Sequence, residues 1–213
     1  VMEHVEPAGI HSGDSACILP SVHISAENLE TIRSYTKRIA EQMGVQGLMN
    51  IQYAIERGRV FVIEANPRAS RTVPLVSKVC GVNMVPIAVD LITAQFTGRP
   101  SAVSGLKERR IPYYGVKEAV LPFNMFPEVD PVLGPEMRST GEVLGLSTSV
   151  SEAYLKAQEA AGAPLPHSGT VLVSVNDQDK PELLPIVKEL AEAGFRFMAT
   201  GKTCALLRSA GLE

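Results

Sequence analysis

The stretch Val62-Ile63-Glu64-Ala65-Asn66-Pro67-Arg68-Ala69-Ser70-Arg71 decides the fold of this chain and carries most of its chemistry. The first residues of the stretch are mostly apolar and β-branched, which is typical of a strand. Side chains of a strand alternate between two faces, so Glu64 and Asn66 project from the same face. Pro67 then fixes the exit of the chain from the strand. The sequence therefore predicts a carboxylate and an amide oxygen on one surface.

A second apolar run, residues 48–55, precedes this strand, and the polar segment between the two runs indicates an antiparallel hairpin. Gln52 lies across from Glu64 if Arg57-Gly58-Arg59 forms a three-residue loop, whereas a two-residue turn would put Gln52 on the wrong face. Oxygen atoms of Gln, Glu and Asn that converge on one spot suit a hard cation such as Mg²⁺.

Two arginines, Arg68 and Arg71, follow the strand three residues apart. Their guanidinium groups could present paired donors to phosphate or carboxylate oxygens. Metal ligands beside arginines predict a phosphoryl-transfer site, in which ions bridge the nucleotide phosphates and arginines hold the acceptor. Taken alone, Glu64 and Asn66 favour a solvent-facing hairpin, and the two arginines could equally be ordinary surface residues. Their combination in one short stretch favours a site.

Working outward, a helix is predicted from Ser25, its N-cap, to Gly44 at the C′ position. Two more helices should cover residues 74–80 and 84–97, each stopped by a glycine. Frequent prolines between residues 99 and 150 leave room only for short strands. The expected strands and the helix that follows them cover residues 115–121, 141–147 and 151–161.

A linker rich in Gly and Pro, residues 162–169, separates a second domain from the first. Beyond the linker the pattern predicts a strand, a helix, a strand and a helix, which is the start of a parallel sheet. These elements are expected at residues 170–175, 181–193, 195–199 and 203–210. Two strands are too few for a complete doubly wound domain.

The composition is that of a cored protein, with 45% hydrophobic and 20% charged residues. A net charge of −3 gives no reason to expect nucleic acid or an acidic membrane as partner. No apolar run approaches the ~18 residues that span a bilayer. The three cysteines have no CxxC spacing, which favours the reducing cytoplasm. Because the chain begins with Val1, we expect an excised piece of a longer protein.

Residues 62–69 resemble the signature of the ATP-grasp ligases in the version used by carbamoyl-phosphate synthases. The stretches Val116-Lys117-Glu118-Ala119-Val120-Leu121-Pro122-Phe123 and Gly134-Pro135-Glu136-Met137-Arg138-Ser139-Thr140-Gly141-Glu142 resemble the second synthetase half of that family's large chain. The resemblance runs over the whole chain.

The resemblance implies an α+β ATP-grasp C-terminal lobe with an antiparallel sheet and helices, followed by the start of an α/β, Rossmann-like domain. The lobe would cover residues 1–98. Residues 99–161 would be the trailing segment of the carbamoyl-phosphate synthetic unit, residues 162–169 the linker, and residues 170–213 a truncated methylglyoxal-synthase-like regulatory domain.

The resemblance also implies ATP, with Mg²⁺ or Mn²⁺, as ligands of the lobe. Metal ligands would be Gln52, Glu64 and Asn66, and the first two of these would also lie at the nucleotide. The implied nucleotide-binding loop is Gly9-Ile10-His11-Ser12. Arg68 and Arg71 would be the catalytic residues that face the phosphate and the small acid substrate.

In the last segment, Lys180, Thr200 and Thr203 match the positions that bind the phosphate of an effector in that family. A cation and two hydroxyls at the ends of parallel strands suit an anion. The family usually has a glycine directly before the second threonine, whereas this chain has Lys202 there.

The activity implied by the resemblance is the phosphorylation of carbamate by ATP to carbamoyl phosphate, for arginine and pyrimidine biosynthesis. The implied partners are a glutaminase small chain, further large chains and an allosteric nucleotide. The chain alone is expected to be inactive, because it lacks the opposing half of the nucleotide cleft. Alternatives are another ATP-grasp ligase, such as a biotin-dependent carboxylase or a purine-pathway enzyme, and a non-catalytic assembly or effector-binding piece.

Overall fold

The computed structural model describes residues 1–103, 106 and 110–212. The predicted segments 99–161 and 170–213 also include residues 104–105, 107–109 and 213, which lie outside the described residues. The chain divides between Pro164 and Leu165 into two compact units, and each unit is considered by itself.

The larger unit is built on an antiparallel sheet with the strand order β1-β2-β5-β6. Its strands are β1 (Glu3–His4), β2 (Cys17–Leu19), β5 (Tyr114–Val120) and β6 (Gly141–Ser147). The two strands predicted in the proline-rich region are therefore confirmed. A short 3₁₀ helix, η1 (Phe123–Met125), follows β5.

Helix α4 (Val150–Ala160) packs against β5 and β6. The close approach requires Gly145, because a Cβ atom there would lie 1.9 Å from the carbonyl oxygen of Ala153. Ala153 and Ala157 are fully buried and form a core cluster with Ile18 and Val116. Small residues on α4 and a glycine on β6 thus allow the backbones of the helix and the strand to pack directly against each other.

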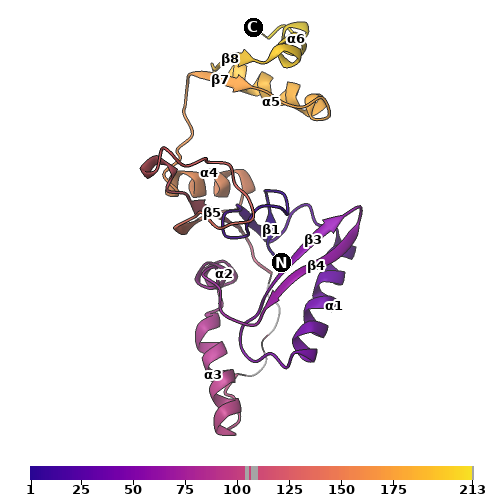
Figure 1. Ribbon diagram of the computed structural model, residues 1–213, viewed down its shortest axis with the longest axis vertical. Helices are drawn as coiled ribbons and strands as arrows, with labels where there is room; N and C mark the ends of the chain where they lie inside the picture. Colours follow the sequence, from indigo (N-terminus) through magenta and orange to yellow (C-terminus); the bar gives the residue numbers. More distant parts are fainter. Residues whose placement is uncertain (104–105, 107–109, 213) are drawn as a thin grey trace. The chain divides into compact units, whose positions relative to one another are not determined.

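The hairpin forms a separate two-stranded sheet of β3 (Asn50–Glu56) and β4 (Arg59–Asn66). Helix α1 (Ala26–Gln42) runs beside it (Figure 1), and the hydroxyls of Thr36 and Tyr53 are 2.8 Å apart. The helix begins as predicted, since the Ser25 side chain accepts a hydrogen bond from the amide of Asn28 at 3.2 Å.

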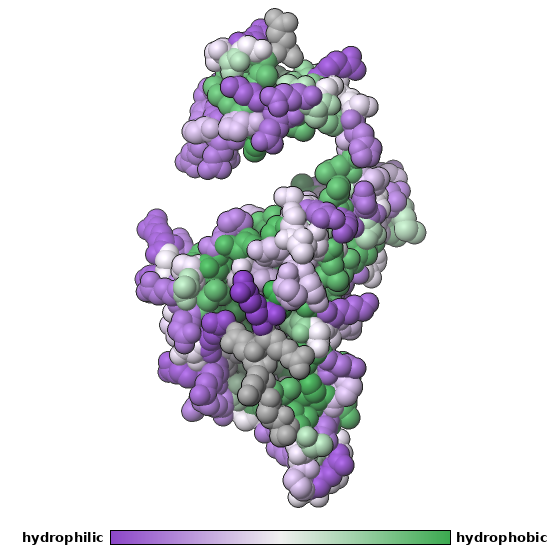
Figure 2. Space-filling view, turned by 180° about the vertical axis from the view of Figure 1, so that it is seen from behind, coloured by the Kyte–Doolittle hydropathy of each residue, from purple (hydrophilic) through white to green (hydrophobic). Residues whose placement is uncertain are grey.

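Helices α2 (Val73–Cys80) and α3 (Met84–Thr97) end at Gly81 and Gly98, both left-handed as the glycine signals predict. Among the described residues no single helix is long and apolar enough to cross a membrane, although α2 and α3 satisfy that test as a pair bent by 111°. Apolar residues are exposed around the lower end of the larger unit in Figure 2, and Phe96 of α3 is 86% exposed.

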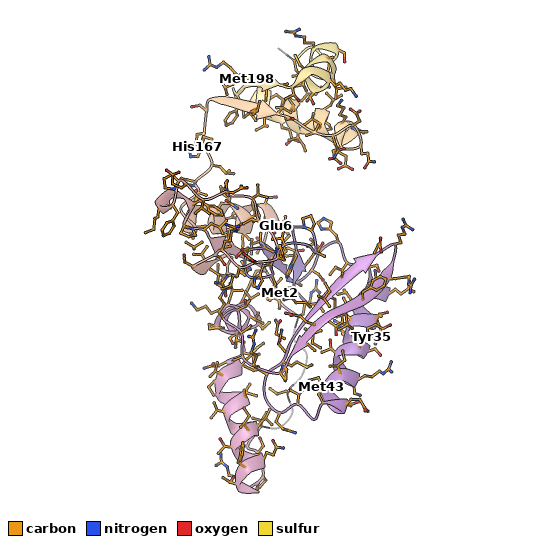
Figure 3. All side chains as sticks on the ribbon, viewed as in Figure 1. Met2, Glu6, Tyr35, Met43, His167 and Met198 are labelled. Carbon is orange, nitrogen blue, oxygen red and sulfur yellow. The ribbon has the colours of Figure 1, made fainter. Side chains whose placement is uncertain are left out.

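In the smaller unit, β7 (Thr170–Val173) and β8 (Arg196–Ala199) pair in parallel, which confirms the predicted arrangement. Helices α5 (Lys180–Glu192) and α6 (Gly201–Ser209) follow the two strands. The core of the unit consists of Val173, Leu183, Val187 and Leu207. Met198, labelled in Figure 3, belongs to β8 but is 64% exposed, so that side chain lies outside this core.

Candidate functional site

The hairpin that carries the candidate metal ligands has a two-residue turn, because Glu56 pairs with Arg59. Both turn residues, Arg57 and Gly58, have positive φ values of 50° and 76°, as the favoured two-residue hairpin turn requires. Of the two turns that the sequence left open, the hairpin has the two-residue one.

Gln52 nevertheless pairs with Glu64, because a bulge restores the register. Tyr53 lies opposite Val62 and Gln52 lies opposite Glu64, so Ile63 is an extra residue on β4. The expected position of Gln52 across from Glu64 is confirmed. The expectation that a two-residue turn would put Gln52 on the wrong face was wrong, since it assumed a regular ladder.

The three predicted metal ligands lie together at this end of the hairpin. Gln52 Nε2 donates to Glu64 Oε1 at 2.8 Å, and Asn66 Nδ2 donates to the same oxygen at 2.9 Å. Within the described part of the chain, Gln52 Oε1, Asn66 Oδ1 and Glu64 Oε2 accept no hydrogen bond. Three oxygen atoms, one of them from a carboxylate, fit the ligand preference of Mg²⁺ or Mn²⁺.

This donor set differs from the usual protein metal centres. The described residues contain no group of three or more His, Cys, Asp or Glu side chains that could hold a metal ion. An ion at the hairpin would therefore depend on one carboxylate and two amides. Such a weak protein shell suits an ion whose other ligands are water and nucleotide phosphates.

The predicted nucleotide loop lies against the hairpin. The Ser12 hydroxyl accepts a hydrogen bond from Gln52 Nε2 at 2.7 Å, and His11 Nδ1 accepts one from the Gly13 amide at 3.0 Å. Loop and hairpin border one cavity of about 930 Å³. Its lining includes Ile10, His11, Ser12, Gln52, Glu64, Asn66, Arg68 and Arg71. Gly9 is not among the lining residues.

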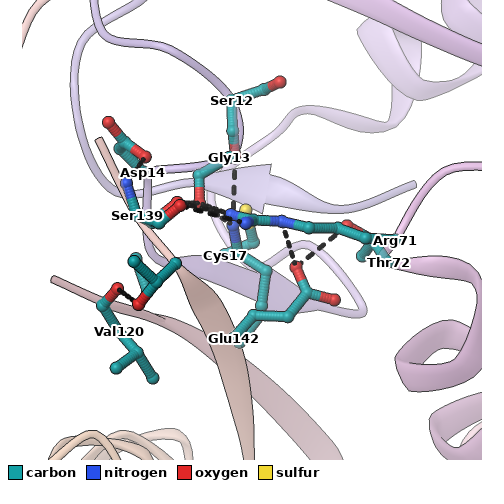
Figure 4. A network of polar contacts seen from close by, with 12 residues as sticks. Ser12, Gly13, Asp14, Cys17, Arg71, Thr72, Val120, Ser139 and Glu142 are labelled. Atoms are coloured by element: carbon teal, nitrogen blue, oxygen red, sulfur yellow. Dashed lines mark hydrogen bonds and ion pairs between the residues drawn. The ribbon is translucent and has the colours of Figure 1, made fainter. Parts of the chain in front are cut away.

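Arg71 lines this cavity, but its guanidinium is tied to the protein (Figure 4). Nη2 donates to the Gly13 carbonyl at 2.7 Å and to Ser139 Oγ at 2.5 Å. Nη1 contacts the Ser139 carbonyl at 3.4 Å, and Nε lies 3.5 Å from a carboxylate oxygen of Glu142. Arg71 therefore fastens the loop to the residues around β6.

Arg68 has a different environment. It is exposed, lines the same cavity, and donates to the neighbouring carbonyl of Ala69 at 3.1 Å. Its guanidinium is free to turn toward a ligand, whereas that of Arg71 is held in place. The sequence suggested the same role for both arginines.

Two buried charged residues support the loop and were missed as site residues. Lys117 is 1% exposed, and its ammonium donates to the carbonyls of Ser12 at 3.0 Å and Gly13 at 3.3 Å. Asp14 is also 1% exposed and accepts from the amides of Arg138 and Ser139 at 2.7 and 2.9 Å. The only sequence signal of the first was a lysine within the predicted strand 115–121.

In the smaller unit, Lys180 begins α5, whereas Thr200 and Thr203 lie at the start of α6. Asp177 accepts from Lys180 at 2.5 Å and from Lys202 at 3.3 Å, and these hydrogen bonds and charges hold the pKa of Asp177 below its usual value. The hydroxyls of Thr200 and Ser174 are 3.1 Å apart. Thr203 is 2% exposed. Lys180 is thus linked to α6 through Asp177.

Residues 1–95 match the family model described as the ATP binding domain of the carbamoyl-phosphate synthase L chain. This part of the chain belongs to that family. Carbamoyl phosphate synthase large chains from Acidobacterium capsulatum and Pasteurella multocida are 49% and 50% identical to this chain over 216 and 213 residues. Each alignment covers 100% of this chain and 20% of the relative. The chain thus spans about a fifth of the length of these relatives.

Solved structures confirm the ATP-grasp fold. An ADP complex of N5-carboxyaminoimidazole ribonucleotide synthetase superposes with a TM-score of 0.52 at 17% identity, over 76% of this chain and 43% of that chain. The biotin carboxylase subunit of pyruvate carboxylase gives 0.51 at 13% identity, over 72% and 43%. These synthetase and carboxylase structures share the fold with this chain, whereas the large chains share about half of its residues.

Proposed function

We propose that this chain forms one wall of an ATP site at which carbamate is phosphorylated to carbamoyl phosphate. The names of the relatives support this reaction. These relatives share about half of the residues of this chain along its whole length. The observation that carries the proposal is the convergence of Gln52 and Asn66 on one oxygen of Glu64, beside Ser12.

The donor set assigns roles to the residues of the hairpin. Gln52, Glu64 and Asn66 would hold a divalent ion through their remaining oxygens. When bound, this ion supplies charge neutralisation at the nucleotide phosphates. Glu64 would contribute the only negative charge among the three ligands, so it should matter most for affinity.

The two arginines would act differently on the substrate. Arg68, which is exposed at the cavity, would bind a carboxylate or phosphate oxygen directly. Arg71 would act mainly by holding Gly13, since its donors are directed at the loop and at Ser139. Positioning and charge neutralisation suffice for phosphoryl transfer, and no protein nucleophile is needed.

A titration of Mg²⁺–ATP into the chain tests this proposal. Binding tighter than ~100 μM, or about −5.5 kcal/mol, would support it. Glu64→Gln should abolish that binding, and in a full-length large chain it should abolish ATP-dependent carbamoyl-phosphate formation. Full activity of that variant would contradict the assigned role of Glu64. Absence of nucleotide binding by the chain would favour a non-catalytic assembly role.

The smaller unit supports a second proposed function, the binding of a nucleotide effector through its phosphate. Lys202 and the hydroxyl of Thr200 lie at the start of α6, where backbone amides favour anions, and Lys180 shares Asp177 with Lys202. Phosphate binding that is lost in Lys180→Met would support the effector site.

The relatives are large chains by name, so a small chain is the proposed protein partner.

A further inference from the structure

Lys117 is the largest of the fully buried side chains in the described part of the protein, although its end is charged. Strand β5 places it between Cys17 of β2 and Leu144 of β6. Burying a charge is costly unless hydrogen bonds or an opposite charge compensate for it. An apolar residue would serve the sheet better, so the lysine requires another explanation.

The ammonium of Lys117 contacts backbone carbonyls in and directly after the nucleotide loop, and it also interacts with the buried thiol of Cys17. Nζ donates to the carbonyls of Ser12 and Gly13, and no carboxylate of the described residues forms an ion pair with it. The Gly13 carbonyl also accepts from Arg71 and Ser139. In the described ranges, however, the Ser12 carbonyl accepts only from Lys117. This residue is therefore the specific anchor of Ser12.

Ser12, held in place by Lys117, in turn contacts the hairpin. Its hydroxyl accepts from Gln52 Nε2 at 2.7 Å, and the same nitrogen donates to Glu64 Oε1 at 2.8 Å. Both hydrogens of the Gln52 amide are thereby used, so the orientation of the carboxamide is fixed. The oxygen of Gln52 is the atom that remains available to a cation.

We infer that Lys117 is a positioning residue for the divalent-cation site of the hairpin. It holds the backbone of Ser12, the Ser12 hydroxyl orients the Gln52 amide, and Gln52 presents its oxygen to the ion. Lys117 also borders the cavity, but its ammonium donates to the loop carbonyls, so it would act through Ser12. The inference rests on the proposed function, because it assumes that Gln52 and Glu64 bind a cation.

The test is a titration of the chain with Mn²⁺, with the free ion followed by electron paramagnetic resonance. Lys117→Met keeps the length of the side chain and removes the ammonium. We expect at least about a tenfold loss of Mn²⁺ affinity, or about 1.4 kcal/mol. The melting temperature should change little, because removal of a buried charge opposes the cost of leaving two carbonyl groups without this donor. An unchanged Mn²⁺ affinity in the folded variant would overturn the inference.

Lys156→Met is the matched control. Lys156 also donates to a backbone carbonyl, that of Leu146 at 3.1 Å, but it lies on α4 and is exposed. Its replacement should leave the Mn²⁺ affinity unchanged. An equal loss of Mn²⁺ affinity in both variants would mean that the net charge of the chain is responsible, and would contradict a specific path through Ser12.

A double-mutant cycle tests the path itself. If Lys117 acts through Ser12, then Ser12→Ala should weaken Mn²⁺ binding, and adding Lys117→Met should weaken it no further. Additive losses would refute the path. If Lys117→Met does not fold, unchanged affinity in Ser12→Ala is sufficient to overturn the inference. A wild-type chain that binds no Mn²⁺ would instead contradict the proposed metal site itself.

Discussion

Ser12 Oγ lies 2.7 Å from Gln52 Nε2, which joins the loop before β2 to the separate hairpin sheet. Ser12 lies in the loop that leads into the four-stranded sheet, Gln52 lies in the hairpin sheet, and both residues line the same cavity. The candidate site is therefore an arrangement of two substructures. Residues that hold the loop or the hairpin in place should therefore affect cation binding as much as the residues that coordinate the cation.

Replacement of the two arginines should separate stability from ligand binding. Arg71→Lys cannot reproduce the contacts to Gly13, Ser139 and Glu142, so we expect a loss of about 1–3 kcal/mol in the free energy of unfolding. Arg68→Lys, at an exposed position, should change it by less than about 0.5 kcal/mol. Urea denaturation of both variants provides the measurement. Equal stability losses would contradict the different roles assigned to the two residues.

Glu118 predicts a pH-dependent stability. It is 9% exposed, and burial, with a further contribution from nearby Glu6, raises its pKa. Because its pKa is raised in the folded state, the protonated Glu118 carboxyl stabilises the fold relative to the ionised one. This stabilisation is fully present below the ordinary pKa of 4.5 and is lost as the pH rises through the raised pKa. Glu118→Gln should therefore be more stable than the wild type at pH 7.5, with a smaller difference at pH 4.

Denaturation curves of both proteins at the two pH values test this expectation. The amide can keep the contact with Gln158, which now donates to Glu118 at 2.7 Å, if the Gln158 amide turns over. Exposed Glu159→Gln is the control, and its stability difference from the wild type should be close to zero at both pH values. A destabilised Glu118→Gln at pH 7.5 would show that the carboxylate is favourable.

Asp177 should compete with anions for the two lysines that it contacts. Asp177→Asn removes the negative charge beside Lys180 and Lys202, so inorganic phosphate should bind several-fold more tightly than to the wild type. Phosphorus NMR titrations measure this affinity. Asp179→Asn, which alters a carboxylate that contacts Asn176 instead, should have a smaller effect. Weaker phosphate binding by Asp177→Asn would contradict the competition.

Gly145 should tolerate no side chain. A Cβ atom at this position would lie 1.9 Å from the Ala153 carbonyl oxygen and 2.7 Å from the Ala157 nitrogen, so α4 would have to move away from β6. We expect Gly145→Ala to cost about 3 kcal/mol or more in the free energy of unfolding. Gly134→Ala is the control, since a Cβ atom there meets nothing within 4 Å. Thermal denaturation of the two variants should differ clearly.

The local elements were largely predictable from the sequence, because glycine and serine signals are read over a few residues. Gly81 and Gly98 end α2 and α3 where expected, and Ser25 caps α1. Alternation along a strand likewise placed Glu64 and Asn66 on one surface, where their side chains are 2.9 Å apart.

The long-range contacts were not predictable in this way. Nothing near Arg71 indicates that Ser139 and Glu142, far along the chain, would hold its guanidinium. Lys117 lies in a strand, and its role depends on a loop more than a hundred residues earlier. These contacts come from tertiary packing, which a single sequence does not display.

The bulge at Ile63 has a consequence for how the hairpin can vary. A three-residue loop over residues 57–59 without a bulge would pair Gln52 with Glu64, as the observed two-residue turn with the bulge does. The outer half of the hairpin can thus slip by one residue while the ligand pair stays in place. Because the bulge lies between the tip and the ligand pair, the length and composition of the tip, residues 56–59, can change without altering the pairing of the cation ligands.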